Sequence, residues 1–128
     1  MRTNRPRVLL DTNLWVAFFK TPLATMRDLL RNGRVATHSV VIGELSVGSL
    51  PHRTLIIDYL QRLPKVAEAA QAEARAMIEH RRLWGRGLQW NDVLLLASAR
   101  IDGVQLWTYD KRLAQAATEL GVAWTGGA

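Results

Sequence analysis

The stretch Val8-Leu9-Leu10-Asp11-Thr12-Asn13-Leu14-Trp15, "VLLDTNLW", decides how the fold of this chain begins. Its apolar start indicates a buried strand over residues 7–10. A carboxylate, a hydroxyl and an amide follow at once, and a helix is predicted from about residue 14 to 20, with Asn13 able to cap it. The sequence therefore predicts an acid, Asp11, at the carboxyl end of a buried strand.

The rest of the chain alternates between helical and strand-like segments in the same way. Helices are predicted at residues 22–31, 40–49, 51–63, 66–84, 91–103 and 111–120, and further strands at residues 34–37, 104–110 and 122–124. Because two parallel strands need a crossover of a dozen or more residues between them, this order predicts an α/β fold with a small, mostly parallel sheet of four or five strands. There is no repeat and no linker, so we expect a single domain over residues 1–128.

Composition excludes several classes of protein. The 128 residues contain no cysteine, which excludes disulfides and thiolate metal sites, and the 3 histidines lack the spacing of zinc ligands. No apolar run is long enough to span a bilayer, and the basic start lacks a signal-peptide cleavage site, so we expect a cytoplasmic protein without a membrane partner. The net charge is +6, and most of the 17 basic residues are arginine, which suits a polyanion or an acidic protein segment.

Four of the 11 acids occupy positions that can converge. Asp11 and Asp110 each follow a predicted strand, and parallel strands bring such residues to one edge of a sheet. Asp92 lies in the first turn of the helix that leads to the strand before Asp110, and Glu44 lies in an otherwise apolar helix. Each also has a structural interpretation: helix capping for Asp11 and Asp110, the helix dipole for Asp92, and simple exposure for Glu44. Those interpretations do not explain why all four should fall at one edge.

Converging carboxylates repel one another unless a cation neutralises them. Oxygen ligands without histidine or cysteine favour Mg²⁺ or Mn²⁺. Such an ion lowers the pKa of a bound water and stabilises a phosphoryl oxygen, which is the chemistry of phosphodiester hydrolysis. The excess of arginine would then hold the polyanionic substrate.

The ordered motifs "LLDTN", a glutamate in the helix after the second strand, "NDVLLLASA" and "LWTYD" resemble the PIN-domain family, and within it the VapC-type toxins of type II toxin-antitoxin modules. The stretch "GRGLQWNDVLLLASA" is similar to one VapC subgroup. The resemblance covers essentially the whole chain and implies a three-layer α/β/α fold. It also implies an Mg²⁺- or Mn²⁺-dependent ribonuclease that is usually a homodimer and is neutralised by a cognate VapB-like antitoxin.

The resemblance assigns candidate roles to individual residues. It implies a catalytic site made of Asp11, Glu44, Asp92 and Asp110. Asp11, Asp92 and Asp110 are the expected metal ligands, and Asn13 and Thr108 are expected to support the ligands from behind. The family often has another acid two residues after the last one, but this chain has Arg112 there, which leaves the number of metal ions open. Arg86 in the "GRG" loop and Arg112 are candidates for contact with RNA, and each is also explained as an exposed basic residue.

Two other functions are compatible with parts of the sequence. A PIN-like module that binds RNA or protein without cutting it would need the fold but not the four acids. A phosphatase of the haloacid dehalogenase type would also use an acidic pocket, but it needs a second aspartate two residues after the first, and that position is Asn13.

Overall fold

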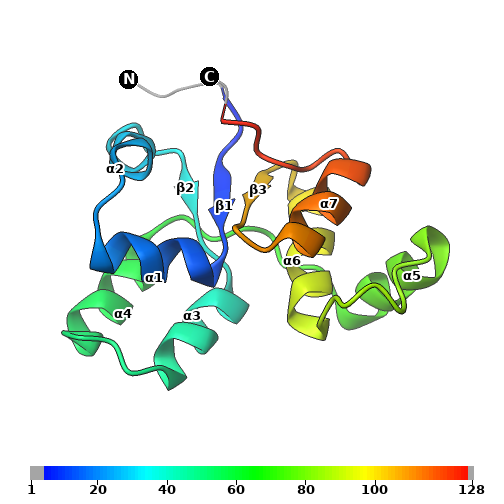
Figure 1. The fold of residues 1–128 in the computed structure, drawn as a ribbon, viewed down its shortest axis with the longest axis horizontal. Helices are drawn as coiled ribbons and strands as arrows, with labels where there is room; N and C mark the ends of the chain where they lie inside the picture. The colour runs from blue at the N-terminus through cyan, green and yellow to red at the C-terminus, as the bar shows by residue number, and fades with distance from the viewer. Residues whose placement is uncertain (1–4, 127–128) are drawn as a thin grey trace.

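The computed structural model describes residues 5–126, and its centre is a parallel sheet of three short strands (Figure 1). The strands are β1 (Val8–Leu10), β2 (Val35–Ala36) and β3 (Gln105–Trp107), in the spatial order β2-β1-β3. Val8 pairs with Val35 on one side and with Gln105 on the other. All three residues of β1 are fully buried, as expected for a central strand with both faces covered.

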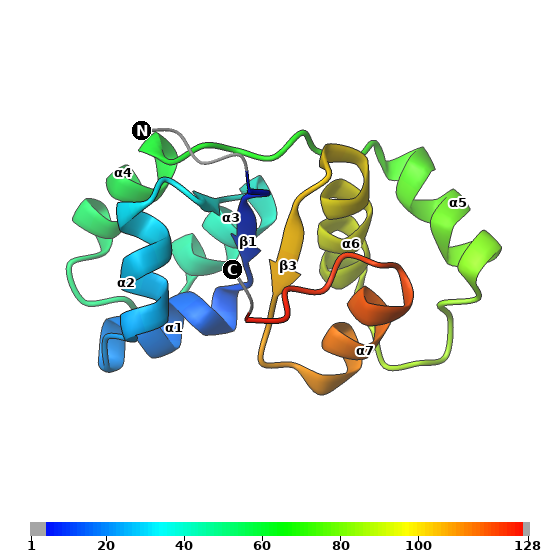
Figure 2. The ribbon, with the colours of Figure 1, turned by 90° about the horizontal axis from the view of Figure 1, so that it is seen from above.

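Helices cover both sides of these strands. The helices within the described part are α1 (Thr12–Lys20), α2 (Ala24–Arg31), α3 (Ser39–Val47), α4 (Arg53–Arg62), α5 (Gln71–Arg81), α6 (Trp90–Asp102) and α7 (Lys111–Glu119). In Figures 1 and 2, α1, α2 and α4 lie to one side of the strands, and α5, α6 and α7 lie to the other. This arrangement confirms the expected α/β fold. Within residues 5–126, no helix has the length and apolar character needed to cross a bilayer.

The sheet is smaller than predicted. In place of a sheet of four or five strands, the described residues form three strands and two isolated parallel bridges, Thr37 with Lys65 and Leu106 with Ala123. The predicted strand at residues 122–124 is therefore wrong, because this segment pairs with β3 over a single residue. Its backbone is nevertheless held, since Leu106 N donates to Val122 O and Trp124 N donates to Leu106 O.

The long helix predicted over residues 66–84 is also wrong at both ends, because α5 spans only Gln71–Arg81. The alanines before it favour a helix, but tertiary hydrogen bonds hold their backbone in an extended path. Val66 N donates to Thr37 O, Ala67 N to an Asp102 carboxylate oxygen, and Ala69 N to the Ser98 hydroxyl. These partners are distant in sequence, so local propensity could not reveal them.

Helix α1 begins two residues before its predicted start. Its N-cap is Asp11, whose carboxylate accepts from Thr12 N at 2.7 Å, so the expectation that Asn13 caps the helix is wrong. Behind this turn, Trp15 is fully buried and stacks against Phe19 with the ring centroids 5.9 Å apart. The core therefore fixes α1 directly behind the acid at the tip of β1.

Candidate active site

Four acids from four separate segments line one open pocket of about 560 Å³ at the carboxyl ends of the strands. Asp11 follows β1, Asp110 lies beyond the end of β3, Asp92 is in the first turn of α6, and Glu44 is in α3. The complete lining is Asp11, Thr12, Asn13, Val16, Ala17, Lys20, Glu44, Asp92 and Asp110. The predicted convergence of the four acids on one pocket is therefore observed.

Asp11 is the most deeply placed of the four acids and is only 7% exposed. Thr108, at the end of β3, donates its hydroxyl to Asp11 Oδ2 at 2.7 Å. The Asn13 amide donates to the same oxygen at 3.3 Å and to Thr108 Oγ1 at 3.2 Å, and Tyr109 N donates to Asn13 Oδ1. Asn13 and Thr108 thus hold the Asp11 carboxylate in one orientation.

Glu44 is held by a residue that the sequence did not single out. The Thr12 hydroxyl donates to Glu44 Oε1 at 2.7 Å and joins α1 to α3. Glu44 is half-buried, so the interpretation of this residue as a freely exposed helix side chain does not apply. The glutamate therefore faces the same pocket as Asp11.

The other two acids combine a position at the pocket with a role at a helix start. Asp110 Oδ1 accepts from Arg112 N at 2.9 Å and from Leu113 N at 3.2 Å as the N-cap of α7. Asp92 Oδ2 accepts from Gln89 N at 2.9 Å at the start of α6. Asp110 thus has the capping role predicted from the sequence, and Asp92 lies in the first turn of its helix, where the helix dipole was the predicted explanation. Each uses only one oxygen of its carboxylate in these bonds.

Two of the four acids, Asp11 and Asp92, have a raised pKa. Burial is the main cause of the raised pKa of Asp11, and the charges of Glu44 and Asp110 add to it, although hydrogen bonds from Thr108 and Thr12 oppose the rise. Burial likewise raises the pKa of Asp92, with added repulsion from Asp11, Asp110 and Glu44. A cation in the pocket would relieve this repulsion.

The donor set suits a hard divalent cation. Of the hydrogen bonds within residues 5–126, none uses Glu44 Oε2, Asp92 Oδ1 or Asp110 Oδ2, so these oxygens are available to a ligand. Such oxygens are the ligands that Mg²⁺ and Mn²⁺ prefer. In this conformation, however, no three acid or histidine side chains of the described chain are grouped closely enough to hold a metal ion. The four acids share a pocket but stand apart, because carboxylates repel one another. They would have to move closer together to coordinate an ion.

Neither arginine suggested for RNA contact lines this pocket. Arg86 forms a bidentate ion pair with Glu119 of α7, with N–O distances of 2.9 and 2.8 Å. These hydrogen bonds lower the pKa of Glu119. The Arg112 side chain packs against the backbone of Gly87, where an added Cβ would lie 2.8 Å from Arg112 Cδ. Both arginines thus connect the "GRG" loop, residues 85–87, to α7.

Sequence reasoning missed Lys20, which is the basic residue among those that line the pocket. Asn13, Val16, Ala17 and Lys20 recur at the three- and four-residue spacing of one helix face, and this face forms one wall of the pocket. That periodicity is visible in the sequence and could have identified Lys20 once Asn13 was placed at the site.

Comparisons with known proteins agree with this geometry. The PIN domain family matches residues 8–119. The chain is 38% identical to ribonuclease VapC32 of Mycobacterium tuberculosis over 117 residues, which cover 91% of this chain and 94% of that protein. Its fold is similar to DNA-bound VapBC from Salmonella typhimurium, with 18% identity, a TM-score of 0.65, and coverage of 87% of this chain and 92% of the other. VapBC-1 from nontypeable Haemophilus influenzae gives 17% identity, a TM-score of 0.70, and coverage of 92% and 96%. At these identities the two structures support the fold alone.

Proposed function

Because the chain belongs to the PIN-domain family, and within it to the VapC group, we propose that it is an Mg²⁺- or Mn²⁺-dependent endoribonuclease and the toxin of a VapBC-type toxin-antitoxin module. The observation that carries the proposal is the pocket itself, where acids from four separate segments meet at the carboxyl edge of the sheet. Helix capping alone does not require that convergence. The 38% identity to a ribonuclease over nearly the whole chain supports the choice of RNA as substrate.

We assign Asp11, Asp92 and Asp110 as metal ligands, and Glu44 to binding or to orienting the attacking water. A bound ion would supply charge neutralisation and a water of lowered pKa. The protein's own contribution is positioning: Thr108 and Asn13 fix the Asp11 carboxylate, and Thr12 fixes Glu44. Catalysis then depends on how rigidly the ends of β1 and β3 hold these groups.

A toxin needs a partner that inhibits it, and we propose that this partner is a VapB-like antitoxin. We also propose that the chain assembles as a homodimer. Three large apolar side chains of α3 and α4 are exposed: Val47 at 89%, Leu55 at 70% and Tyr59 at 39%. Apolar residues left open in this way are typical of surfaces that another chain covers. They make the α3–α4 region the candidate contact for one of these two partners.

The second candidate, a PIN-like module that binds without cutting, has less support. A binding module has no need for a half-buried Glu44 held by Thr12, nor for an Asp11 whose pKa is raised by burial and, to a smaller extent, by its acidic neighbours. Maintaining such repulsion costs folding free energy, and a ligand that neutralises the acids would justify that cost.

The test is cleavage of RNA by the purified chain, stripped of metal and then supplied with Mn²⁺ or Mg²⁺, with the new RNA ends mapped by sequencing. We expect cleavage that EDTA abolishes and that Asp92→Asn lowers at least a hundredfold. Glu79→Gln, which removes the same charge from an exposed position on α5, is the matched control and should cleave normally. Binding of RNA and of Mn²⁺ without cleavage would contradict the enzyme proposal and favour the binding module.

A further inference from the structure

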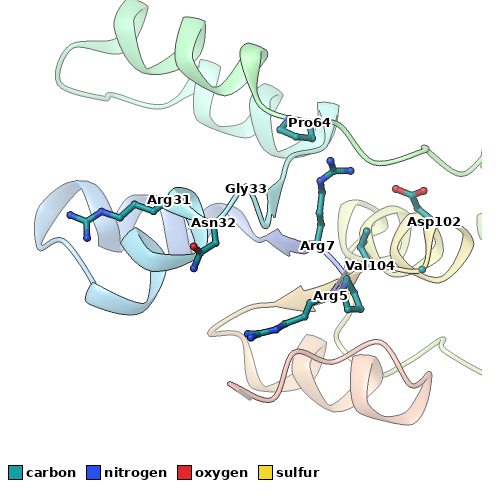
Figure 3. Close-up of a pocket in the computed structure, with 10 residues that line it drawn as sticks. Arg5, Arg7, Arg31, Asn32, Gly33, Pro64, Asp102 and Val104 are labelled. Atoms are coloured by element: carbon teal, nitrogen blue, oxygen red, sulfur yellow. The ribbon is translucent and has the colours of Figure 1, made fainter. Parts of the chain in front are cut away.

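A second hollow, of about 780 Å³, lies at the opposite, amino-terminal ends of the strands (Figure 3). It is formed by the segment before β1, the end of α2 and the turn after it, Pro64 beyond the end of α4, and the end of α6 and the turn after it. The lining residues include Arg5, Arg7, Arg31, Asn32, Pro64 and Asp102. The proposed catalytic mechanism uses none of them.

The charges around this hollow are predominantly positive. Three arginines line it and one acid, Asp102, opposes them. The Asp102 carboxylate already accepts from Ala67 N at 3.2 Å. Within residues 5–126, the side chains of Arg7 and Arg31 make no ion pair or hydrogen bond with the protein. Two exposed guanidinium groups therefore remain available to an anion.

The segment that carries Arg5 and Arg7 is fixed in place. Arg34, whose side chain is buried, donates to the carbonyl of Pro6 through Nε at 3.3 Å and through Nη2 at 3.0 Å. Burial and the nearby charge of Arg5 both lower the pKa of Arg34, which indicates a positive potential in this region. Because the backbone of the segment is anchored, only the arginine side chains, and not the segment that carries them, need to become ordered when they bind.

A structural explanation covers only part of this cluster. Arg31 lies in the last turn of α2, where a cation stabilises the negative end of the helix dipole. Arg5 and Arg7 precede a strand, so the dipole does not explain them. In Figure 3 the guanidinium groups of the three arginines point in different directions. Such a spread suits several phosphates along a chain better than one small anion.

The catalytic pocket supplies few cations of its own for a phosphate backbone. Its lining has four acids and one lysine, so a single divalent ion does not offset all of its negative charge. Affinity for RNA must then come from cations elsewhere on the chain. We propose that the arginine hollow at the amino ends of the strands binds the phosphate backbone of the RNA substrate, at nucleotides far from the cleaved bond. This inference rests on the proposed ribonuclease function.

The distance between the two sites determines which RNAs can use both. Arg7 and Asp11 are four residues apart along β1, about 13 Å through the sheet. A path over the surface of a domain of this size is on the order of 50 Å. A pentanucleotide cannot cover that path, whereas a folded RNA of tRNA size can. The hollow should therefore favour large folded RNAs over short ones.

The test compares Arg7→Gln/Arg31→Gln with a matched control, Arg75→Gln/Arg81→Gln, which removes the same charge from exposed positions on α5. Binding of a folded RNA of tRNA size is measured over a salt series in the Asp11→Asn background, which prevents cleavage. We expect the first pair to weaken binding roughly tenfold or more at about 0.1 M salt, and to reduce the slope of log affinity against log salt by about 1.4 to 1.8 relative to the control pair. With Asp11 restored, KM for the folded RNA should rise with kcat unchanged, and cleavage of a pentanucleotide should not change.

An unchanged salt slope in the Arg7→Gln/Arg31→Gln pair would overturn the inference. So would a loss of binding to polyglutamate in this pair with RNA binding intact, because the hollow would then be a site for an acidic protein segment. Failure of the ribonuclease proposal gives a different result: the chain with all its acids would bind RNA through the hollow and leave it uncut.

Discussion

Replacing Asp11 by Asn tests the candidate site at its most deeply held residue. Asparagine has almost the same shape and caps helices about as well as aspartate, so the bond from Thr12 N should survive. The charge disappears, and with it the proposed metal ligand nearest the tip of β1. Loss of one metal-binding carboxylate removes several kcal/mol of transition-state stabilisation, which corresponds to at least a hundredfold loss of cleavage.

The expected effect of this substitution on folding is small because two contributions oppose each other. Thr108 and Asn13 both donate to Asp11 Oδ2, and an amide nitrogen placed there would lose at least one of these bonds, at about 1 kcal/mol. In the other direction, each unit by which the folded state raises the pKa of a carboxyl costs about 1.4 kcal/mol at neutral pH, and asparagine removes that cost. We expect the free energy of unfolding to change by less than about 2 kcal/mol.

The pH dependence of stability gives a second measurement on the same variant. The folded protein holds the Asp11 proton to higher pH than the unfolded chain does, because the folded pKa lies above the ordinary value of 3.8. The contribution of Asp11 to the stability of the wild-type chain should therefore fall as pH rises from that value through the folded pKa, and stay constant above it. In Asp11→Asn this contribution is absent, so the variant gains stability relative to the wild-type chain over the same range.

The assays are urea unfolding followed by circular dichroism between pH 3.5 and 8, and thermal unfolding with and without Mn²⁺. An ion at about 100 times its Kd stabilises the folded state by about 2.7 kcal/mol, which corresponds to roughly 10 °C in Tm for a chain of this length. We expect this shift in the wild-type chain and in Glu79→Gln, and little or none in Asp11→Asn. An equal Mn²⁺ shift in Asp11→Asn, or full ribonuclease activity in that variant, would refute the assignment.

Three further substitutions test the surroundings of the acids. Thr108→Val removes the hydroxyl that donates to Asp11 Oδ2, so the rate of cleavage should fall about 10- to 100-fold and the free energy of unfolding by about 1–3 kcal/mol. The control, Thr118→Val on the surface of α7, should change neither quantity when both variants are measured by RNA cleavage and by urea unfolding. Gly87→Ala forces an L-residue to φ 79° beside Arg112, so it should lower the free energy of unfolding by about 1–2 kcal/mol and also reduce cleavage. Gly43→Ala, in α3 with open space around it, should instead raise the free energy of unfolding by about 0.5–1 kcal/mol. Equal Tm values for the two variants would contradict this reasoning. Lys20 lies seven residues after Asn13, about 10 Å along α1, so it lines the pocket at a distance from the acids. In steady-state kinetics Lys20→Gln should therefore raise KM severalfold with little change in kcat, and Arg27→Gln on α2 serves as the control.

Much of the site was predictable because its signals are local. The apolar run of β1 ends directly on Asp11, and the strand before Thr108 and Asp110 ends in the same way, so the rule for parallel sheets was enough to place these acids at one edge. Asp92 could be placed because α6 runs back towards the start of β3. The role of Thr12 could not be predicted, because its partner Glu44 is 32 residues away.

The sequence by itself determined the order of helices and strands and the four acids at the carboxyl ends of the strands, because both follow from hydrophobic pattern and chain direction. Only the tertiary structure decided three other features. Residues 66–70 are extended because Thr37, Asp102 and Ser98 satisfy their backbone groups. Arg86 forms an ion pair because the fold places Glu119 of α7 beside it. The arginine hollow exists because residues from separate turns meet at the amino ends of the strands. Each depends on partners far apart in the chain, and a local pattern does not record which of those partners meet.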